Sequence, residues 1–304
     1  MKHDVILWGG GAGYDAFVYL HGFEKVNAVA IIDKADPFYS TIDGIPVIKP
    51  DQLNCLIFEY VIVCAWKDEL VKNIISDIEA AGIDRKRIIP LRVFKISYFD
   101  FDDYIRIKDS EISILSDYCF AGLLYHRFGL MFKSPTINMF TNNENYIRFI
   151  SRLEHYMEAE MVEVPDWSNR PYADLYTYPR GRIGDVEWIF NHNMDFESAY
   201  KRWNTGVKRF NWNNYIVIMT LENDEMAYRF EDVPIKHKIG FYWKELNLSS
   251  VICLPRWNDP AYRSRFDYCF SAMVNRIATE EDGVRAVNWM KALLHENDYK
   301  RTTV

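Results

Sequence analysis

The chain has 304 residues, of which 49% are hydrophobic and 26% are charged, a composition typical of a globular protein with about two domains. Its formal net charge of −7 argues against nucleic acid and anionic membrane surfaces as partners, because both are usually bound by basic surfaces. No stretch approaches the ~18 apolar residues of a membrane span, and the five cysteines form no C-x-x-C pair, so we expect a cytoplasmic protein with free thiols.

The first predicted elements enclose a glycine-rich turn. The apolar run Val5–Trp8 is typical of a buried parallel strand, the segment 14–23 has apolar residues at helical spacing and closes with Gly22, and "VNAVAIID" at 26–33 is typical of a second buried strand. Four glycines lie around the turn: Gly9, Gly10, Gly11 and Gly13. This order of strand, glycine turn, helix and strand is that of a Rossmann-like domain.

The spacing of these glycines favours a nucleotide site. Gly11, Gly13 and Ala16 fit the fingerprint G-x-G-x-x-G/A, and Asp33 stands 20 residues after Gly13, where such folds place the acid that binds ribose hydroxyls. A register that starts two residues earlier puts Tyr14 in the third glycine position and fits less well. In either register the missing side chains let backbone N–H groups approach a phosphate at the helix N-terminus. We predict that the four glycines and Asp33 bind a nucleotide; the alternative is a turn that only lets helix and strand pack closely.

Further elements complete the first domain. They are a short extended run at Ile45–Ile48, a helix that begins at Pro50, a strand at 60–66, an amphipathic helix at 67–82 and a short strand at 88–91. We expect this domain to span residues 1–95. Its roughly three main strands correspond to one mononucleotide-binding half of a doubly wound fold, so a nucleotide-sugar is favoured over NAD.

The N-terminal third resembles a known group of domains. The segments "AIIDKADPFYSTIDGIPVIKPDQL", "YVIVCAW" and "GIDRKRIIPL" are similar to the N-terminal domain of bacterial sugar O-acyltransferases and of other glycan-modifying enzymes. The resemblance covers roughly residues 2–92 and implies that the glycine loop binds a nucleotide-sugar. The chain departs from the group in its three consecutive glycines and in Tyr14, which stands where the group usually has glycine.

The second predicted domain, residues 110–304, is also α/β, and the boundary lies in the aromatic and acidic segment 92–110. Its predicted elements are a strand at 112–116, a helix at 119–129, a strand at 135–140, a helix at 143–157 capped by Thr141 and Glu144, extended segments at 161–164, 173–179 and 185–192, a helix at 196–210 capped by Asp195, strands at 215–221, 237–243 and 250–255, and a last helix at 271–294.

This second part resembles a bacterial family of unknown function that is often labelled as exopolysaccharide-biosynthesis proteins. The resemblance rests on "ISILSDYCFAGLLYHRFGLMFKSPTINMF", "YPRGRIGDVEWIFNH" and "AYKRWNTGVKRFNWNNYIVI", and it covers roughly residues 112–254. It implies a role in surface glycan assembly but no particular reaction. The family usually reads Ser-Asn-x-Cys where this chain has Ser116-Asp117-Tyr118-Cys119, and it usually has arginine at the position of Gly206.

Candidate chemistry concentrates in residues 180–192, which hold two arginines, two carboxylates and a histidine. On a strand, Asp185, Glu187 and Ile189 would share a partly buried face, and the two carboxylates could hold Mg²⁺ or Mn²⁺ beside a diphosphate. We name Asp185 and His192 as candidate catalytic residues. The alternative is a half-exposed strand with solvated charges.

Other candidates are less favoured or less specific. The helix after Asp195 carries Lys201, Arg202, Lys208 and Arg209, and its basic face could hold a phosphate. Cys119 and His126 share a face of their predicted helix but lie about 10 Å apart along its axis, which argues against a bonded pair. Ser134 lies in no G-x-S-x-G motif.

The sequence therefore predicts a two-domain α/β protein, Rossmann-like at its N-terminus, that binds a nucleotide or nucleotide-sugar. Three functions stay open: a transferase acting on a sugar in surface polysaccharide biosynthesis, a non-catalytic nucleotide-sugar-binding module or scaffold, and, less favoured because the first domain is short, an NAD-dependent oxidoreductase.

Overall fold

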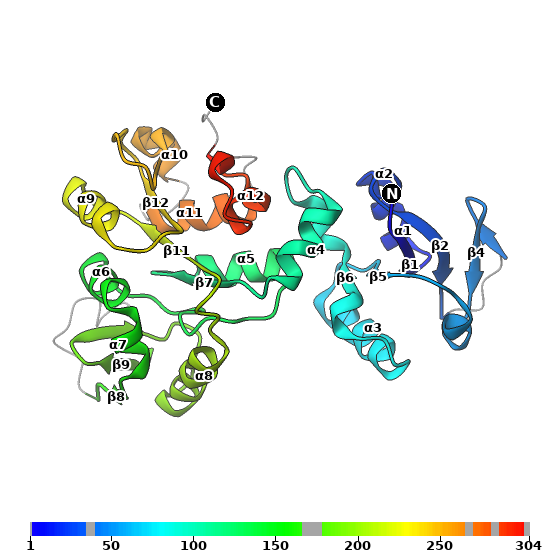
Figure 1. The fold of residues 1–304 in the computed structure, drawn as a ribbon, viewed down its shortest axis with the longest axis horizontal. Coiled ribbons are helices and arrows are strands. Elements are labelled where there is room, and N and C mark those ends of the chain that lie inside the picture. The colour runs from blue at the N-terminus through cyan, green and yellow to red at the C-terminus, as the bar shows by residue number, and fades with distance from the viewer. Residues whose placement is uncertain (1, 35–39, 166–177, 265–269, 281–285, 301–304) are drawn as a thin grey trace. The chain divides into compact units, whose positions relative to one another are not determined.

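The computed structural model describes residues 2–34, 40–165, 178–264, 270–280 and 286–300. Contacts divide the chain into two compact units (Figure 1), a first unit of Met1–Asp109 with Arg127–Gly129 and a second unit of Ser110–His126 with Leu130–Val304. Each unit contains a sheet of parallel strands accompanied by helices. The predicted α/β class is therefore confirmed.

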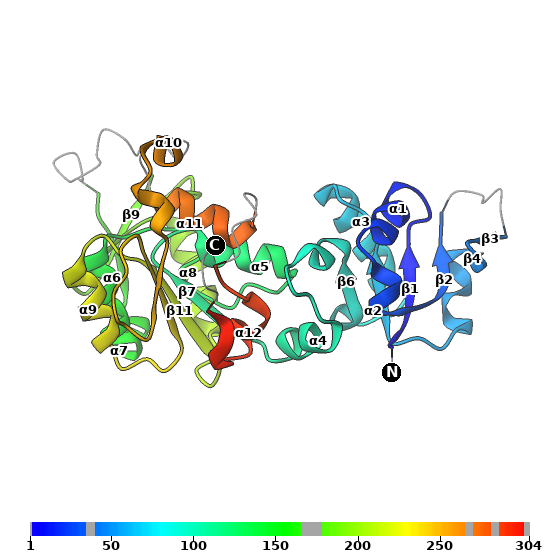
Figure 2. The ribbon, with the colours of Figure 1, turned by 90° about the horizontal axis from the view of Figure 1, so that it is seen from above.

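The first unit is built on one sheet with the strand order β3-β4-β2-β1-β5-β6. Its strands are β1 (Asp4–Trp8), β2 (Asn27–Ile32), β3 (Thr41–Ile42), β4 (Ile45–Ile48), β5 (Tyr60–Val63) and β6 (Ile88–Pro90). All pairs are parallel except β3 with β4, and Figure 2 shows β1 and β2 side by side. The chain runs outward from β1 through β2 to β4 and returns to the other side at β5, so the carboxyl end of β1 is a topological switch point.

This sheet is wider than the three main strands that the sequence analysis expected. Five parallel strands stand in the order β4-β2-β1-β5-β6, which matches five positions of the dinucleotide-binding order. The two outer parallel strands, β4 and β6, have only four and three residues, too few for a strong apolar pattern. The number of strands therefore no longer separates a nucleotide-sugar from NAD.

The helices of the first unit are α1 (Ala12–Tyr19), α2 (Gly22–Lys25), α3 (Asp68–Ala80) and α4 (Phe101–Asp109), with 3₁₀ turns at Pro50–Cys55, Arg85–Arg87 and Leu91–Lys95. The prediction that Gly22 closes the first helix is wrong, because α1 already ends at Tyr19 and Gly22 begins α2. A Cβ at Gly22 would lie 2.2 Å from the Phe17 ring, so glycine is needed there for packing. The apolar face of α3 packs in one core cluster with residues of β1, β5 and β6.

The second unit has two sheets. The first is parallel, with the order β13-β12-β11-β7, and comprises β7 (Ser113–Ser116), β11 (Tyr215–Thr220), β12 (Lys238–Tyr242) and β13 (Val251–Cys253). The other is antiparallel, with the order β10-β9-β8, and comprises β8 (Met161–Glu163), β9 (Arg180–Ile183) and β10 (Val186–Ile189).

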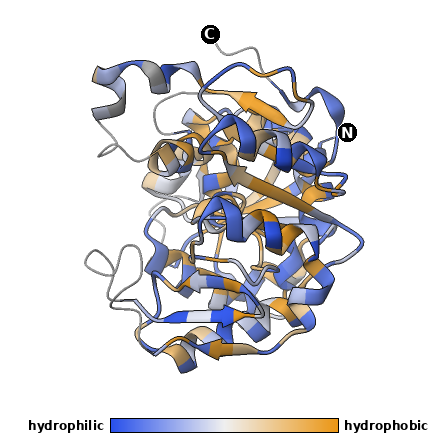
Figure 3. Cartoon of the chain, turned by 90° about the vertical axis from the view of Figure 1, so that its left-hand side faces the viewer, coloured by the Kyte–Doolittle hydropathy of each residue, from blue (hydrophilic) through white to orange (hydrophobic). Residues whose placement is uncertain are grey.

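Helices surround these sheets: α5 (Phe120–Phe128), α6 (Asn143–Ser151), α7 (Leu153–Glu158), α8 (Phe196–Arg209), α9 (Asp224–Asp232), α10 (Pro260–Arg263), α11 (Phe270–Thr279) and α12 (Trp289–Leu293), with 3₁₀ turns at Pro255–Asn258 and Asn297–Tyr299. Aromatic side chains fill the core. Trp188 packs edge-on against Phe149, with the ring centroids 5.2 Å apart, and Trp203 lies 6.0 Å from both rings. In Figure 3 hydrophobic colour lies on inner strands, and hydrophilic stretches mark helices on the outside.

Three predicted elements of the second unit need correction. The segment 135–140 is a series of turns with a single bridge at Phe140, because Pro135 has no N–H to donate and Asn138 adopts a φ of 53°. The long helix at 143–157 is broken at Arg152, whose φ and ψ are −138° and 50°. The last predicted helix is two helices, since Glu280 adopts a φ of 51° directly after α11.

The helix cap at residues 141–144 also differs from the prediction. Asn142 caps α6, and its side chain accepts a hydrogen bond from the Asn145 N–H at 2.8 Å. Thr141 instead donates its hydroxyl to the carbonyl of Glu187 at 2.6 Å. The predicted cap Asp195 of α8 is confirmed, with its carboxylate accepting from the Ser198 N–H at 2.7 Å.

Candidate functional site

The glycine turn follows β1 and leads into α1. Gly9 has a φ of 118°, a conformation that favours glycine, and its N–H donates to the Ile32 carbonyl at 2.8 Å. A Cβ at Gly13 would lie 1.7 Å from the Cys64 carbonyl oxygen. Gly13 is therefore required for the close approach of α1 to the end of β5, which is the packing role of a glycine in such turns.

Gly10 holds the acidic residue at the end of β2. Its N–H donates to Asp33 Oδ2 at 3.1 Å, and a Cβ at this position would lie 2.9 Å from the same oxygen. The carboxylate that the sequence analysis assigned to ribose thus lies directly beside the turn.

Gly11 marks the open part of the turn. It is the N-cap residue of α1, it offers no side-chain cap, and a Cβ built there would meet no atom within 4 Å. The first N–H groups of a helix need partners from outside the helix. The space in front of α1 is thus suited to an anionic group, because the helix dipole adds partial positive charge at this end.

Tyr14 stands directly after the last glycine of the turn. The side chain is buried, and its hydroxyl donates to Asp43 Oδ2 at 2.7 Å. Asp43 and Gly44 have φ values of 50° and 80° and form the turn between β3 and β4. Tyr14 therefore ties α1 to this hairpin. Burial, together with Asp43, raises the pKa of the Tyr14 hydroxyl.

In the second unit the structure brings Cys119 and His192 together. Cys119 lies one residue before α5, His192 lies three residues after β10, and Cys119 Sγ is 3.9 Å from His192 Nε2. The turn before α5 is fixed by Ser116, whose hydroxyl oxygen accepts from the Ala121 N–H at 3.0 Å and donates to the Tyr118 carbonyl at 2.5 Å. This geometry presents the thiol beside an exposed imidazole.

The charges near Cys119 act in opposite directions. Burial raises the pKa of the thiol to about 11, although the Arg202 guanidinium of α8 lowers it and Asp117 raises it. Arg202 is itself fixed by a hydrogen bond to the Asn138 carbonyl at 3.1 Å. Cys119 is therefore a thiol at neutral pH, and it must lose its proton to a base to become a nucleophile.

A buried hydrogen-bond network joins the carboxyl ends of β7 and β11 next to this pair. Asp117 is only 4% exposed, and its Oδ2 accepts from the N–H and the hydroxyl of Thr220 at 3.1 and 2.5 Å. Asn143 donates to the Thr220 carbonyl at 2.8 Å and accepts from the Glu222 N–H at 2.9 Å. Burial raises the pKa of Asp117 to about 7. The carboxyl ends of parallel strands are where α/β proteins commonly bind ligands.

Most of the second unit belongs to a region that matches a known family. A model described as "Domain of unknown function (DUF1919)" matches residues 91–291, about two thirds of the chain. The chain belongs to the DUF1919 family. A second model, described as "C2185-like, N-terminal", matches residues 1–89, so the glycine turn lies in one matched region and Cys119 and His192 in the other. An uncharacterised protein of Haemophilus influenzae is similar, with 20% identity over 183 residues, which are 54% of this chain and 84% of that protein.

Within the DUF1919 region, Asp185 lies apart from His192. Asp185 occupies the two-residue turn between β9 and β10, after Gly184 with its φ of 57°, whereas His192 follows the far end of β10. Four strand residues separate the two ends by about 13 Å. The expectation that Asp185 belongs to the strand and shares a face with Glu187 and Ile189 is therefore wrong, because the chain reverses direction at Asp185.

Asp185 pairs with side chains of α6 and α7. Its side chain is 57% exposed and lies 3.3 Å from the Arg148 guanidinium, and it accepts a hydrogen bond from the Tyr156 hydroxyl at 2.6 Å. The Tyr156 bond, with help from Arg148, lowers the pKa of Asp185. Its partners thus come from α6 and α7 and not from the arginines of its own segment or from the basic helix α8.

Among the described residues, no three His, Cys, Asp or Glu side chains gather in a way that could hold a metal ion. No helix of this part of the chain is both long and apolar enough to cross a membrane. Cys55, Cys64, Cys119 and Cys253 are free thiols, whereas Cys269 and most of the predicted extended segment 173–179 lie outside the described residues.

Proposed function

We propose that the first unit binds a nucleotide, in the first place a nucleotide-sugar, at the Gly9–Gly13 turn. The observation that carries this proposal is the hydrogen bond from Gly10 to Asp33, which holds a carboxylate beside the open N-terminus of α1. The site lies at the switch point of a parallel sheet, where doubly wound proteins commonly bind nucleotides.

Each part of the turn has a distinct role in this proposal. The backbone N–H groups at Gly11 and Ala12 bind a phosphate, because no side chain occupies the space in front of them. The Asp33 carboxylate binds ribose hydroxyls. Gly9 and Gly13 serve mainly packing, since the Cys64 carbonyl leaves no space for a side chain at either position.

The class of nucleotide rests on the N-terminal resemblance to sugar O-acyltransferases, which favours a nucleotide-sugar. An NAD-type dinucleotide is the second candidate, and one observation supports it: the five parallel strands follow the dinucleotide-binding order. A panel that contains both classes distinguishes the two candidates.

For the second unit we propose a transferase that acts on a sugar during surface glycan assembly, the setting that the exopolysaccharide resemblance implies. Of the two predicted catalytic residues, His192 has the better support, because it lies 3.9 Å from the Cys119 thiol. A Cys–His pair supports a covalent transfer in which the imidazole takes the proton of the thiol, the thiolate attacks the anomeric carbon of the sugar, and the bond from that carbon to the phosphate oxygen breaks, so that the nucleotide leaves. The alternative is a non-catalytic module or scaffold that binds the nucleotide-sugar without turnover.

The binding proposal is tested by thermal shift and calorimetry with UDP-, GDP- and CMP-sugars, acyl-CoA and NAD(H). Gly11→Val should leave the fold intact, because a Cβ there meets nothing. It should abolish binding, because the valine side chain would occupy the space proposed for the phosphate. Valine is a poorer N-cap residue than glycine, which costs about 1 kcal/mol of stability. Asp33→Asn should weaken binding, whereas Asp15→Asn, on the exposed first turn of α1, is the matched control. If no nucleotide shifts the wild-type melting temperature, the turn serves packing alone and the proposal fails.

The catalytic proposal needs the ligand that this panel identifies. With that donor, Cys119→Ser and His192→Ala should each lower the rate about 100-fold or more, and Asp185→Asn should do the same if its carboxylate takes part in proton transfer. An Asp185→Asn variant that melts earlier but keeps full activity assigns Asp185 to the hairpin turn. Binding without turnover in the wild type would favour the module.

A further inference from the structure

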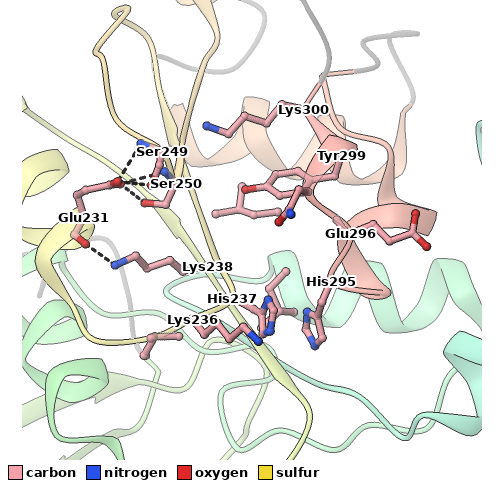
Figure 4. Close-up of a pocket in the computed structure, with 15 residues that line it drawn as sticks. Glu231, Lys236, His237, Lys238, Ser249, Ser250, His295, Glu296, Tyr299 and Lys300 are labelled. Atoms are coloured by element: carbon pink, nitrogen blue, oxygen red, sulfur yellow. Dashed lines mark hydrogen bonds between the residues drawn. The ribbon is translucent and has the colours of Figure 1, made fainter.

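The second unit contains a pocket of about 370 Å³ at the end of the parallel sheet opposite Asp117 and Cys119. Figure 4 shows it between the beginning of β12, the segment before β13 and the residues that follow α12. Lys238 is the first residue of β12, and Ser250 directly precedes β13. The volume falls in the range of small-molecule sites.

Three lysines line this pocket, together with two carboxylates, Glu231 and Glu296. Lys238 donates to the main-chain carbonyls of Glu231 and Val233, and Lys300 donates to the carbonyl of Val251 at 3.1 Å. Lys236 is exposed and forms no ion pair or hydrogen bond with the residues that the structure describes. Carbonyl oxygens satisfy N–H donors but carry no net charge. The charge of Lys238 and Lys300 is offset in part by Glu231, which acts on both.

The carboxylate of Glu231 is occupied by other partners. Its two oxygens accept from the N–H groups of Ser249 and Ser250 at 2.8 and 3.0 Å and from both hydroxyls. Burial opposes ionisation, but these hydrogen bonds lower the pKa of Glu231 to about 2. Figure 4 shows the other lining carboxylate, Glu296, directed away from the three lysines. The lining therefore has three lysines against two carboxylates, a small positive excess inside a chain with a net charge of −7.

Two stacked imidazoles complete the lining. The rings of His237 and His295 lie 3.6 Å apart at 19°. His295 Nε2 is 2.6 Å from Asn214 Oδ1, while its Nδ1 is buried and has no hydrogen-bond partner within the described residues. Burial, with His237 and Lys236 nearby, lowers the pKa of His295 to about 4, and burial lowers the pKa of His237. Buried polar atoms without partners in a native structure often indicate an absent water, ion or ligand.

We propose that this pocket binds a small phosphate-bearing anion through Lys236, Lys300 and His237. The small positive excess favours an anion, and lysine is a common phosphate ligand. The remaining lining, which includes Ile216, Ile239 and Tyr299, leaves room for an organic group attached to the phosphate. This site is separate from the glycine turn, because its lining belongs entirely to the second unit.

The test is calorimetric titration of the full chain with inorganic phosphate, glucose 1-phosphate and glucose. Both phosphate-bearing probes should bind saturably and glucose should not. Lys236→Gln and Lys300→Gln should each weaken binding about 10-fold, the loss of one hydrogen bond between charged groups. Lys72→Gln on the exposed face of α3 is the matched control and should bind as the wild type does. Tighter binding of glucose 1-phosphate assigns the pocket to a phosphate ester, and equal affinities assign it to the free anion.

Nuclear magnetic resonance of the histidines provides a second measurement that does not depend on folding of the lysine variants. Phosphate should raise the pKa of His237 and leave that of His192 unchanged. Gly11→Val should leave phosphate affinity intact, which separates this site from the proposed nucleotide site. The proposal is overturned if neither lysine variant weakens phosphate binding, if the wild type shows no saturable binding, or if Gly11→Val abolishes it.

Discussion

Replacing Asp117 by asparagine should make the second unit more stable at neutral and alkaline pH. Asp117 is 4% exposed, and burial raises its pKa from 3.8 to about 7. The asparagine carbonyl oxygen can accept the same two hydrogen bonds from Thr220 that Oδ2 accepts now. The substitution thus keeps the bonds between β7 and β11 and removes only the ionisable group.

The sign and size of the effect follow from proton linkage. Between pH 4 and pH 7 the folded chain retains a proton that the unfolded chain has lost, so the free energy of unfolding falls as the pH rises through this window. Three pKa units correspond to about 4 kcal/mol. The new amide N–H groups need partners, at a cost of about 1–3 kcal/mol, which leaves a gain of about 1–3 kcal/mol above pH 7.

Urea unfolding followed by tryptophan fluorescence at pH 5 and pH 8 measures this difference. The wild type should lose stability between the two values and Asp117→Asn should lose much less. Asp185→Asn removes an exposed carboxylate from the same unit and should leave the pH dependence unchanged in this window. If the free energy of unfolding depended on pH in the same way for the wild type and for Asp117→Asn, the raised pKa of Asp117 would be refuted.

Three further predictions concern single side chains. Iodoacetamide at pH 8 should alkylate Cys119 more slowly than exposed Cys55, because burial raises the pKa of Cys119 to about 11; equal rates would contradict this. Asn142→Ala should lower the free energy of unfolding by about 1 kcal/mol through loss of the α6 cap, whereas Thr141→Asn should not restore it, since Thr141 bonds to Glu187 instead. Glu231→Gln should reduce the loss of stability on acidification from pH 4.5 toward pH 2, because a depressed pKa stabilises the folded state above this window and the effect is lost as Glu231 is protonated; an unchanged acid transition would argue against it.

The parallel strands could be predicted because their signal is local. Val5–Trp8, Tyr60–Val63 and Tyr215–Thr220 are continuous apolar runs, and each forms a strand buried between helices or other layers. The turn at Gly184 and Asp185 also had a local signal, since Gly-Asp between two extended runs is typical of a two-residue hairpin. The density of charged residues in this segment instead favours a strand through Asp185, which is the prediction that the structure corrects.

The Cys119–His192 pair and the basic pocket could not be predicted in this way. Cys119 and His192 are 73 residues apart. Their meeting depends on the bridge between Phe140 and Ile189 and on the hydrogen bond from the Thr141 N–H to the Asp117 carbonyl. The pocket joins residues of β12, the segment before β13 and residues 292–300, which are far apart in the sequence. Contacts of this kind are set by the tertiary arrangement and leave no pattern in any one stretch of sequence.

Gly206 restricts which substitutions the chain can accept at this position of α8. A Cβ at this position of α8 would lie 2.4 Å from Pro135 Cα and 2.5 Å from the Ser134 carbonyl oxygen, and backbone atoms cannot rotate away as a side chain can. An arginine, which the resembling family usually has here, therefore requires a different path for residues 134–135. Substitutions at 206 and changes in that loop should occur together in lineages, and each alone should be deleterious.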